Sequence, residues 1–458
     1  MTNNRLITAD VVVCGAGTAG AVAAIAAADQ GRDVLLIEQS GSAGGSASLG
    51  LVTPMMHTGI AGNPMCSYLS LEINLRMTEI GAAAGDGSAF DPTMLPFVLE
   101  QMLLERKVHV MLHTTIIGAK RDHRRLTELE IFSKSGRATV SGAMIIDATG
   151  DGDVCELAGL NMLHGNEEDG KNQPVSLRYI VGGVDKAAFC EYLKKYYKNS
   201  FQPESVSGAV TRGDGRTWPL DPVFDAAIEA GEIVYEDAIY WQFFSIPGRK
   251  DCIAFNCPEF FDIHDADDGD SLTEVQLQGK QAILRQLLFY RRHFGGFEGA
   301  YIASVAQFVG VRESRRAVTE HVITAEELLT HTKFDDAICQ SNYPVDVHGR
   351  KLRCETIRPA APDEPPFYEV PLRALIVRDV DNLLVSGRNL GAEFVAQSSI
   401  RIIPTCRAMG EAAGIAAAFA CGRSDKNAHS ISGRDVRAEM LRRGAQFADR
   451  PGLNDVRH

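Results

Sequence analysis

Two arginine-bearing segments of this sequence could bind a negatively charged small molecule. Arg312 opens the run RESRR, whose guanidinium groups could hold a substrate carboxylate through paired hydrogen bonds. They could instead pair with neighbouring acids and tie parts of the fold together. Arg401 follows the polar run QSS and stands just before a long helix of small residues, so it is the second candidate for contact with a ligand.

Two histidines could move a proton. In the run NYPVDVH, extended backbone would put Asp346 and His348 on one face and Tyr343 on the other. A histidine with a carboxylate partner can act as a general base near neutral pH, and a hydrogen-bonded structural pair is an equally good interpretation. His57 is a candidate on its position alone. The spacing of the His, Cys, Asp and Glu residues predicts no metal site.

The elements that must position these side chains start near the N-terminus. Asp10 to Cys14 is a short β-branched run that predicts a buried parallel strand. A G-x-G-x-x-G motif follows at positions 15, 17 and 20 and opens a helix predicted from Thr18 to about Gln30. The first glycine allows a tight turn, the second lets the backbone approach a pyrophosphate, and the third lets the helix pack on the strand. The helix N-terminus turns its N–H groups towards the phosphates.

A second strand, predicted over residues 33–37, leads into Glu38. A carboxylate at this point can accept hydrogen bonds from an adenosine ribose and would repel a 2′-phosphate. Gly44 and Gly45 then bring bare backbone towards a ligand that lies across the strand ends. Strand, glycines, helix, strand and acid in this order predict a dinucleotide site.

The rest of the chain predicts an α/β fold with a Rossmann-like domain, made of a parallel sheet plus an antiparallel meander, and an inserted α+β domain. The predicted nucleotide domain spans residues 1–159 and 363–425, the inserted substrate domain 160–362, and a helical tail 426–458. The predicted helices outside the first motif cover residues 91–107, 272–294, 299–306, 404–421 and 432–445. The predicted strands cover residues 108–113, 116–120, 126–133, 138–141, 144–153, 175–181, 253–255, 368–377 and 382–386.

Composition excludes several classes of function. The net charge is −13, from 46 basic and 59 acidic residues, which argues against a basic face for nucleic acid or an acidic membrane. The ten cysteines form no C-x-x-C and suit a reducing compartment. The N-terminus lacks the layout of a signal peptide, and no run has the length of a membrane span. We therefore expect a cytoplasmic protein that acts on a small molecule and could assemble as a homo-oligomer.

Several motifs together resemble FAD-dependent oxidoreductases of the glutathione-reductase-like superfamily. They are the glycine loop with Glu38, the GG loop, the run IIDATG ending at Gly150, and NLLVSGRNLG with the helix after it. The runs DATGDGDVCELAG, GVRESRRAVTEHVITAEELL, YPVDVH and SGRNLGAEFVAQSSIRIIPTCRAMGEAAGIAAA are similar to one branch of that superfamily, whose members are often of unassigned substrate. The cysteine pair of disulfide reductases is missing after the GG loop, and so is the tryptophan motif of flavin halogenases.

The resemblance implies an extended FAD, with NAD as the competing ligand. The glycine turn would hold the diphosphate, Glu38 the adenosine ribose, and backbone at 116–117 the adenine. Residues 45–46 would lie along the ribityl chain, residues 150–151 near the diphosphate and ribose, and the start of the last long helix near the flavin pyrimidine. The residues so assigned to FAD are Gly15, Gly17, Thr18, Ala19, Gly20, Glu38, Gln39, Gly44, Gly45, Ser46, Ile116, Ile117, Ala148, Thr149, Gly150, Asp151, Gly387, Arg388, Arg401 and Ile402.

With such a cofactor, the sequence predicts hydride transfer between a small polar or carboxylated organic substrate and flavin N5, with an unidentified electron acceptor or donor. The catalytic candidates are Arg401, Arg312, His348 and His57. Two alternatives remain open at this point. One is a redox-neutral FAD enzyme of the isomerase or hydratase type, and the other is a flavoprotein component of a larger electron-transfer or RNA-modification system.

Overall fold

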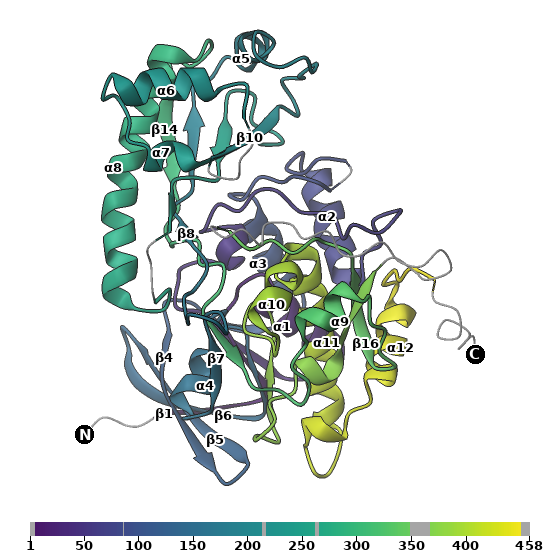
Figure 1. Ribbon diagram of the computed structural model, residues 1–458. Helices are drawn as coiled ribbons and strands as arrows, with labels where there is room; N and C mark the ends of the chain where they lie inside the picture. The colour runs from purple at the N-terminus through teal and green to yellow at the C-terminus, as the bar shows by residue number, and fades with distance from the viewer. Residues whose placement is uncertain (1–4, 86, 213–216, 262–264, 349–366, 450–458) are drawn as a thin grey trace.

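A mixed sheet forms the centre of the larger of two units, the lower one in Figure 1. The computed structural model describes residues 5–85, 87–212, 217–261, 265–348 and 367–449. In sheet order the strands are β3 (His109–Met111), β2 (Val34–Ile37), β1 (Arg5–Cys14), β6 (Gly136–Asp147), β5 (Arg125–Ser133) and β4 (Thr115–Asp122), and β18 (Leu383–Val385) also pairs with β6. The pairs β1–β2, β2–β3, β1–β6 and β6–β18 are parallel, whereas β4–β5 and β5–β6 are antiparallel. The Rossmann-like sheet with its meander is therefore confirmed.

One long strand joins the two parts of this sheet. The sequence predicts separate strands over residues 138–141 and 144–153, but β6 runs without a break and ends at Asp147. It pairs with β1 along most of its length, while its other edge is shared by β5 over residues 136–140 and β18 over residues 145–147. Gly142 suggests a break in the sequence pattern, yet the pairing with β1 continues through it. The ATG run after Asp147 lies in the turn that follows.

Alternation along β1 builds two cores. Val11 and Val13 face the hydrophobic cluster that contains α1 (Gly20–Asp29) and α11 (Ile403–Cys421). Val12 and Cys14 face the cluster of the meander and α4 (Asp153–Leu157). A strand buried on both faces is what its unbroken apolar run predicts. The remaining helices of this unit are α2 (Tyr68–Glu79), α3 (Leu95–Glu105), α9 (Ala325–Leu329), α10 (Phe394–Ile400), α12 (Gly433–Arg443) and the short 3₁₀ turns η1 (Gly45–Ala47), η2 (Leu372–Ala374) and η3 (Ala428–Ser430).

Helices α1 and α11 pack at backbone distance. A methyl group placed on Gly410 would lie 2.3 Å from the carbonyl oxygen of Ala19, and one on Gly414 would lie 2.3 Å from that of Ala23. The facing side chains are mostly alanines, so little separates the two backbones. This contact draws the returning C-terminal part of the chain onto the first helix.

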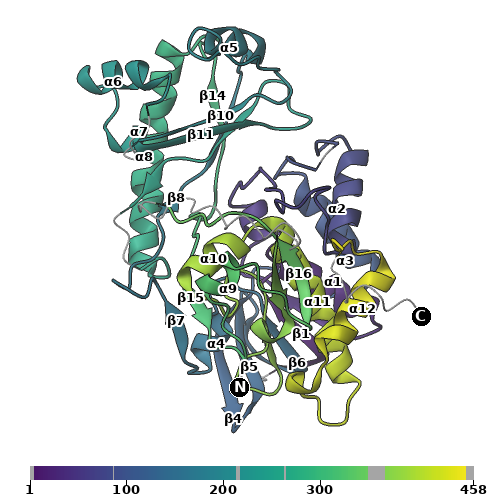
Figure 2. The same cartoon turned by 45° about the vertical axis from the view of Figure 1, so that its right-hand side comes forward.

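The smaller unit, uppermost in Figures 1 and 2, is an antiparallel sheet with an aromatic core. Rings of Tyr179, Phe255 and Tyr290 stack at centroid distances of 5.0 Å. The helix α8 (Gly269–His293) runs down one side of the molecule in both views. The other elements, in sheet and then chain order, are β10 (Ser207–Thr211), β11 (Tyr240–Ser245), β12 (Ile253–Phe255), β9 (Tyr179–Gly182), β14 (Tyr301–Val305), α5 (Lys186–Leu193), α6 (Asp221–Glu229) and α7 (Glu236–Ile239).

Three short strand pairs among the described residues stand outside the two larger sheets. They are β7 (Met162–His164) with β15 (Arg315–Ala317), β8 (Val175–Ser176) with β13 (Glu259–Phe260), and β16 (Ala337–Ser341) with β17 (Tyr368–Pro371). The pairs β7–β15 and β16–β17 pack against cores of the larger unit, and β8–β13 has a small cluster of its own. The predicted domain boundary at 362/363 lies outside the described residues, and the predicted division stays a prediction. The core of the larger unit includes Ile323 and Val347, which supports an inserted unit narrower than 160–362.

Three further predicted elements are wrong in type or extent. The predicted helix at 299–306 is strand β14, because its residues pair with the edge of β9 and tertiary pairing overrides a weak helical pattern. The predicted strand at 175–181 is two strands, because β8 and β9 belong to different sheets. The predicted strand at 368–377 stops at Pro371 and continues as η2. In the described part of the chain, no helix is both long and apolar enough to cross a membrane.

The close packing of α1 on α11 makes Gly410 sensitive to substitution. Gly410→Ala should lower the free energy of unfolding by about 1–3 kcal/mol, because the added methyl group has no room beside the Ala19 carbonyl. Denaturant unfolding measures this change. Gly269→Ala, at the start of α8 where a methyl group meets no atom within 4 Å, is the control and should shift the value by at most about 1 kcal/mol. Equal effects of the two substitutions would contradict the packing argument.

Candidate functional site

The turn after β1 is built so that one glycine faces open space. Gly15 has φ +92°, and a methyl group on it would lie 2.6 Å from the carbonyl oxygen of Ala148. A methyl group on Gly20 would lie 1.9 Å from the carbonyl oxygen of Gly15. Gly17 differs, because its nearest such neighbour is 4.0 Å away and its φ lies outside the left-handed region. Of the three glycines of this motif, Gly17 is the one with open space beside it, where a ligand could lie.

Glu38 closes this turn from the second strand. Its Oε2 accepts a hydrogen bond from the Ala16 backbone N–H at 2.7 Å, and its Oε1 accepts one from Ser40 at 2.8 Å. The GG loop packs against the same turn, since the N–H of Gly44 donates to the carbonyl of Ala16 at 2.8 Å. These contacts bring the loop containing Gly45 and Ser46 to the glycine motif, whereas Gln39 is exposed.

The turn after β6 is held by a buried carboxylate. Asp147 Oδ1 accepts hydrogen bonds from the Thr149 N–H at 3.2 Å and its hydroxyl at 2.7 Å. Burial raises the pKa of Asp147, and the hydrogen bonds from Thr149 and Cys155 oppose that rise. Gly150 has φ +87°, and Arg388 donates to Asp151 Oδ1 at 2.9 Å. The turn after β6, which carries the ATG run, therefore lies beside the segment that follows β18.

Several buried polar atoms near this segment lack hydrogen-bond partners within the described ranges. The Gln397 side-chain NH₂ donates to the carbonyls of Arg312 and Arg388, at 3.1 and 3.3 Å, while its oxygen is unsatisfied. The other unsatisfied atoms are Arg401 Nε, Arg388 Nη1 and Gln173 Nε2. Because buried polar groups are nearly always paired in folded proteins, such a cluster fits a bound polar ligand.

A chain of alternating charges crosses the junction of the two units. Arg312 lies 2.8 Å from Glu259, and Glu259 lies 2.7 Å from His348 Nδ1. His348 Nε2 lies 3.3 Å from Asp346 Oδ1, and Arg401 lies 3.5 Å from Asp346 Oδ2. The exposed fraction of the side chain is 4% at Arg312 and 1% at Glu259, compared with 11% at His348, 30% at Asp346 and 16% at Arg401. We call these five residues the charged chain.

Electrostatics keep Asp346 ionised. Burial alone raises its pKa, but the neighbouring charges of His348, Arg401 and Arg312 outweigh burial and hold the pKa below the usual range. Arg401 also donates to the backbone carbonyl of Asp346 at 3.2 Å. The carboxylate therefore acts as a fixed negative charge beside His348.

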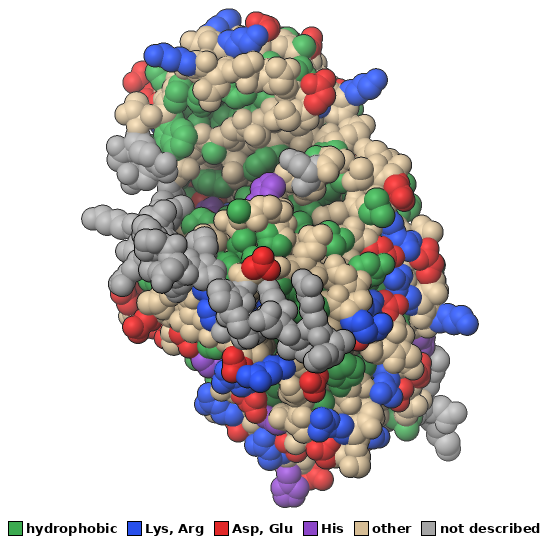
Figure 3. Space-filling model, turned by 90° about the vertical axis from the view of Figure 1, so that its right-hand side faces the viewer, with side chains coloured by type: hydrophobic (Ala, Val, Ile, Leu, Met, Phe, Trp, Pro, Cys, Tyr) green, Lys and Arg blue, Asp and Glu red, His purple; other side chains and the backbone are tan. Residues whose placement is uncertain are grey.

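The smaller unit supplies one wall of this site. On β11, Trp241 and Phe243 point into the aromatic core, so the alternate residues Tyr240 and Gln242 face the other way. The ring of Tyr240 meets that of His348 edge-on at 5.2 Å. The surface is hollowed between the two units in the view of Figure 3. The charged chain thus lies at the junction of the two units, with β11 on one side of it.

Two sequence expectations about these segments are wrong. The run RESRR suggests a strand-to-helix junction at Arg312, but it enters the short strand β15 instead. Residues 342–348 form no strand, and Tyr343 donates to Asp346 Oδ2 at 3.4 Å, so the alternation that separates them fails. His348 takes a second carboxylate, Glu259, from a part of the chain 89 residues earlier.

His57 lies apart from the charged chain in the contacts that the structure describes. Its side chain is exposed, and the next residue, Thr58, accepts a hydrogen bond from the Ser341 hydroxyl at 3.2 Å. Its catalytic role stays a prediction.

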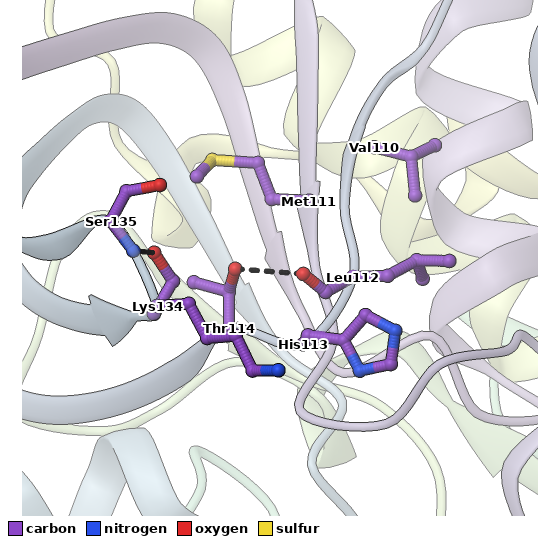
Figure 4. A pocket seen from close by; sticks show the side chains of 8 residues that line it. Val110, Met111, Leu112, His113, Thr114, Lys134 and Ser135 are labelled. Atoms are coloured by element: carbon purple, nitrogen blue, oxygen red, sulfur yellow. Dashed lines mark hydrogen bonds between the residues drawn. The ribbon is translucent and has the colours of Figure 1, made fainter.

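A pocket of about 430 Å³ lies at the carboxyl end of β3, away from the charged chain. Figure 4 shows Met111, His113, Thr114 and Lys134 around it. Backbone hydrogen bonds of 2.9 Å join Met111 and Thr114 to Glu38. Ile116 and Ile117, half-buried at the start of β4, follow directly. This pocket therefore belongs to the neighbourhood of Glu38 rather than to the junction of the units.

Sequence reasoning missed Glu259, Gln173 and Arg178. Glu259 and Arg178 each stand as the single charged residue of a short apolar run, Arg178 within the predicted strand 175–181, whereas Gln173 follows the polar run GKN. The available signal is a single charged residue in such a run, as in CPEFF or SLRYIV. Such a residue type alone does not indicate which side chain it will contact in the folded protein.

Comparison with protein families matches residues 10–440 to the family described as FAD dependent oxidoreductase. The chain belongs to this family. It is accordingly an FAD-dependent oxidoreductase, and the open Gly17, the Glu38 carboxylate and the cluster of unsatisfied polar atoms fit that cofactor. The recognition made from the motifs is confirmed. A search of curated proteins gave no match.

Solved structures share the arrangement only loosely. A geranylgeranyl bacteriochlorophyll reductase-like protein from Thermoplasma acidophilum is 12% identical, with a TM-score of 0.48 over 95% of this chain and 83% of that chain. The flavin-dependent brominase Bmp2 is 11% identical, with a TM-score of 0.47 over 95% and 83%. The p-nitrophenol 4-monooxygenase PnpA from Pseudomonas putida is 11% identical, with a TM-score of 0.44 over 96% and 86%. Similarity at this level does not bear on the substrate.

The open position at Gly17 predicts a selective loss of cofactor. Gly17→Val should weaken FAD binding by at least about 100-fold, because the new side chain would occupy ligand space. The apoprotein should keep its free energy of unfolding within about 0.5 kcal/mol, because the Cβ atom comes no closer than 4.0 Å to a protein atom. FAD titration and denaturant unfolding measure the two effects. Gly269→Val, whose Cβ atom would have no neighbour within 4 Å, is the control, and a Gly17→Val protein that holds FAD normally would refute this cofactor position.

Proposed function

We propose that this FAD-dependent oxidoreductase transfers a hydride between a small polar or carboxylated organic substrate and the flavin, at the junction of its two units. The observation that carries the proposal is the charged chain. It places the His348 imidazole between two carboxylates, each of which is paired with a guanidinium group. Unsatisfied polar atoms lie next to this set. Such a set can bind charge and move a proton, which are the tasks a flavin leaves to the protein.

The FAD-binding role of the glycine turn and its neighbours is part of this proposal. Residues 15–20 would hold the diphosphate, Glu38 the adenosine ribose, residues 116–117 the adenine, and residues 45–46 the ribityl chain. Residues 150–151 would lie near the diphosphate and ribose. The short β1–α1 turn and the buried Glu38 carboxylate support this assignment.

The start of α11 would face the flavin pyrimidine. Its N-cap residue, Ile402, supplies no side-chain cap, so its first N–H groups remain available, and Pro404 stands in the first turn. The positive end of the helix dipole would stabilise negative charge at that position. Gly387, Arg388 and Arg401, from the segment before the helix, would approach the same part of the flavin.

When bound, FAD accepts or donates a hydride at N5. Arg401 would orient the substrate or the flavin, since its Nε is buried and unsatisfied while its Nη2 reaches Asp346 and Gln173. Arg312 is held by Glu259 and by the carbonyl of Pro174 at 2.6 Å, which favours a role in fixing Glu259. We therefore assign Arg312 to positioning rather than to contact with the substrate.

His348 would exchange the companion proton. Glu259 is buried and holds Nδ1 at 2.7 Å, so it can fix the orientation of the ring and keep the Nδ1 proton in place. The contact of Nε2 with the more exposed Asp346 is longer, at 3.3 Å. This difference supports Nε2 as the atom that takes up or releases a proton at the site.

Anaerobic absorbance spectroscopy tests the proposed reaction. Purified protein should show oxidised flavin bands near roughly 375 and 450 nm, as FAD enzymes do. These bands should bleach with one compound from a panel of hydroxy acids, amino acids, sugars and reduced nicotinamides. Free FAD with the same compounds is the control. A protein with bound flavin that no compound bleaches would contradict hydride transfer and favour redox-neutral chemistry or an electron-transfer partner.

The proton-exchange role predicts a specific effect of His348→Gln. The rate of flavin reduction by the bleaching compound should fall about 10²- to 10⁴-fold, the range that general acid–base catalysis contributes. FAD affinity should stay unchanged, because His348 is joined to the charged chain rather than to the glycine turn. Stopped-flow absorbance measures the rate. His123→Gln, whose side chain is 95% exposed, is the control, and unchanged reduction by His348→Gln would rule out this role.

A further inference from the structure

Arg178 is the one arginine of the site without an acidic partner in the described ranges. It lies in the two-residue connection between β8 and β9 and is half-buried. Arg312 pairs with Glu259, and Arg401 pairs with Asp346. Arg178 instead donates through Nε to the side-chain oxygen of Asn256 at 2.6 Å. Its positive charge is therefore not neutralised by an ion pair with any described carboxylate.

The guanidinium group is held in one orientation. Asn256 is itself fixed, because its NH₂ donates to the Gln242 side-chain oxygen at 2.8 Å and to the Tyr240 hydroxyl at 3.1 Å. The backbone carbonyl of Arg178 accepts a hydrogen bond from Ala306 at 2.8 Å. With Nε committed to Asn256, the two Nη groups carry the remaining donors, and they form no hydrogen bond in the described contacts.

A glycine leaves room beside these donors. A methyl group on Gly310 would lie 3.2 Å from Arg178 Nη1, so a larger residue would crowd the guanidinium group. Burial, followed by the charge of Arg312, lowers the pKa of Arg178 to about 9. The group is still charged at neutral pH, although its surroundings disfavour that charge. An anion bound to the Nη edge would relieve this cost.

The Arg178 patch is continuous with the charged chain. Tyr240 accepts from Asn256 at 3.1 Å, and its ring meets His348 edge-on at 5.2 Å. A ligand held by Arg178 would therefore lie within reach of the proton-exchanging residue. Four N–H groups remain on the two Nη atoms, and one from each Nη points in parallel, which matches the two oxygens of a carboxylate.

We infer that Arg178 binds a carboxylate group of the substrate through its two Nη groups, so that the substrate is an organic acid whose reacting end points towards His348. This inference rests on the proposed function and adds the substrate class to it. Arg178 becomes a determinant of specificity, with Asn256 as the residue that positions it.

Benzoate binding to the FAD-loaded protein tests the inference without turnover. Benzoate is the carboxylate probe, and benzamide, of the same shape but uncharged, is its control. Calorimetry and the change in flavin absorbance report binding. Wild-type protein should prefer benzoate over benzamide. Arg178→Met should lower benzoate affinity about 10- to 100-fold and leave benzamide affinity unchanged, because a charge-assisted paired contact is lost.

Two further variants keep the test decisive. Arg434→Met removes an arginine whose side chain is 68% exposed and should leave benzoate affinity unchanged. Arg178→Lys keeps the charge but loses the forked donors and the bond to Asn256, so its affinity should fall between those of the wild type and Arg178→Met. If Arg178→Met fails to retain FAD, the lysine variant decides the matter.

Several results would overturn the inference. They are equal benzoate affinity in wild type and Arg178→Met, no preference of the wild type for benzoate over benzamide, or full affinity in Arg178→Lys. Failure of the proposed reaction is seen separately, because it appears as flavin that no compound bleaches while benzoate binding can still depend on Arg178.

Discussion

The backbone contact between α1 and α11 is the constraint on which the site depends. Gly410 faces Ala19 and Gly414 faces Ala23, so the two helices run side by side in the same direction. Because α11 begins at Ile403, it starts seven residues before that contact, which is about 10 Å of helix. Its N-terminus therefore extends beyond the first β–α turn. The same packing that builds the core sets the offset between a diphosphate at the glycine turn and a flavin ring at α11.

A second constraint is electrostatic and joins the two units. Each carboxylate of the charged chain lies between cationic or ionisable groups, so neither Glu259 nor Asp346 is buried alone. Removing one partner from such a buried arrangement is costly, because the other charge remains without compensation. Glu259 comes from the strand pair β8–β13 and His348 from the segment after β16, so the charged chain forms only where these two parts of the fold meet.

Local patterns explain why much of the nucleotide unit was predictable. The β-branched run of β1, the glycines at 15, 17 and 20, and the acid at the end of β2 each depend on near neighbours in sequence. The long helices α8, α11 and α12 were equally predictable, because their apolar or small residues and first-turn signals are local. The wrong predictions concern segments whose secondary structure depends on pairing with a strand that is distant in sequence. Strand β14 was expected as a helix, and β6 was expected as two strands, because the edge offered by β9 and the continuous pairing with β1 are not visible in the sequence.

The amino-acid sequence by itself determined the Rossmann-like fold class, the FAD-dependent family and the candidates Arg312, His348 and Arg401, since these rest on residue type and short-range spacing. Only the tertiary structure decided how they are used. It pairs Arg312 with Glu259, sets a carboxylate at each nitrogen of His348, and brings in Arg178, which no motif marked. The physical reason is that the role of a buried charged group depends on the groups it contacts. Those groups come from distant parts of the chain, which only folding brings together.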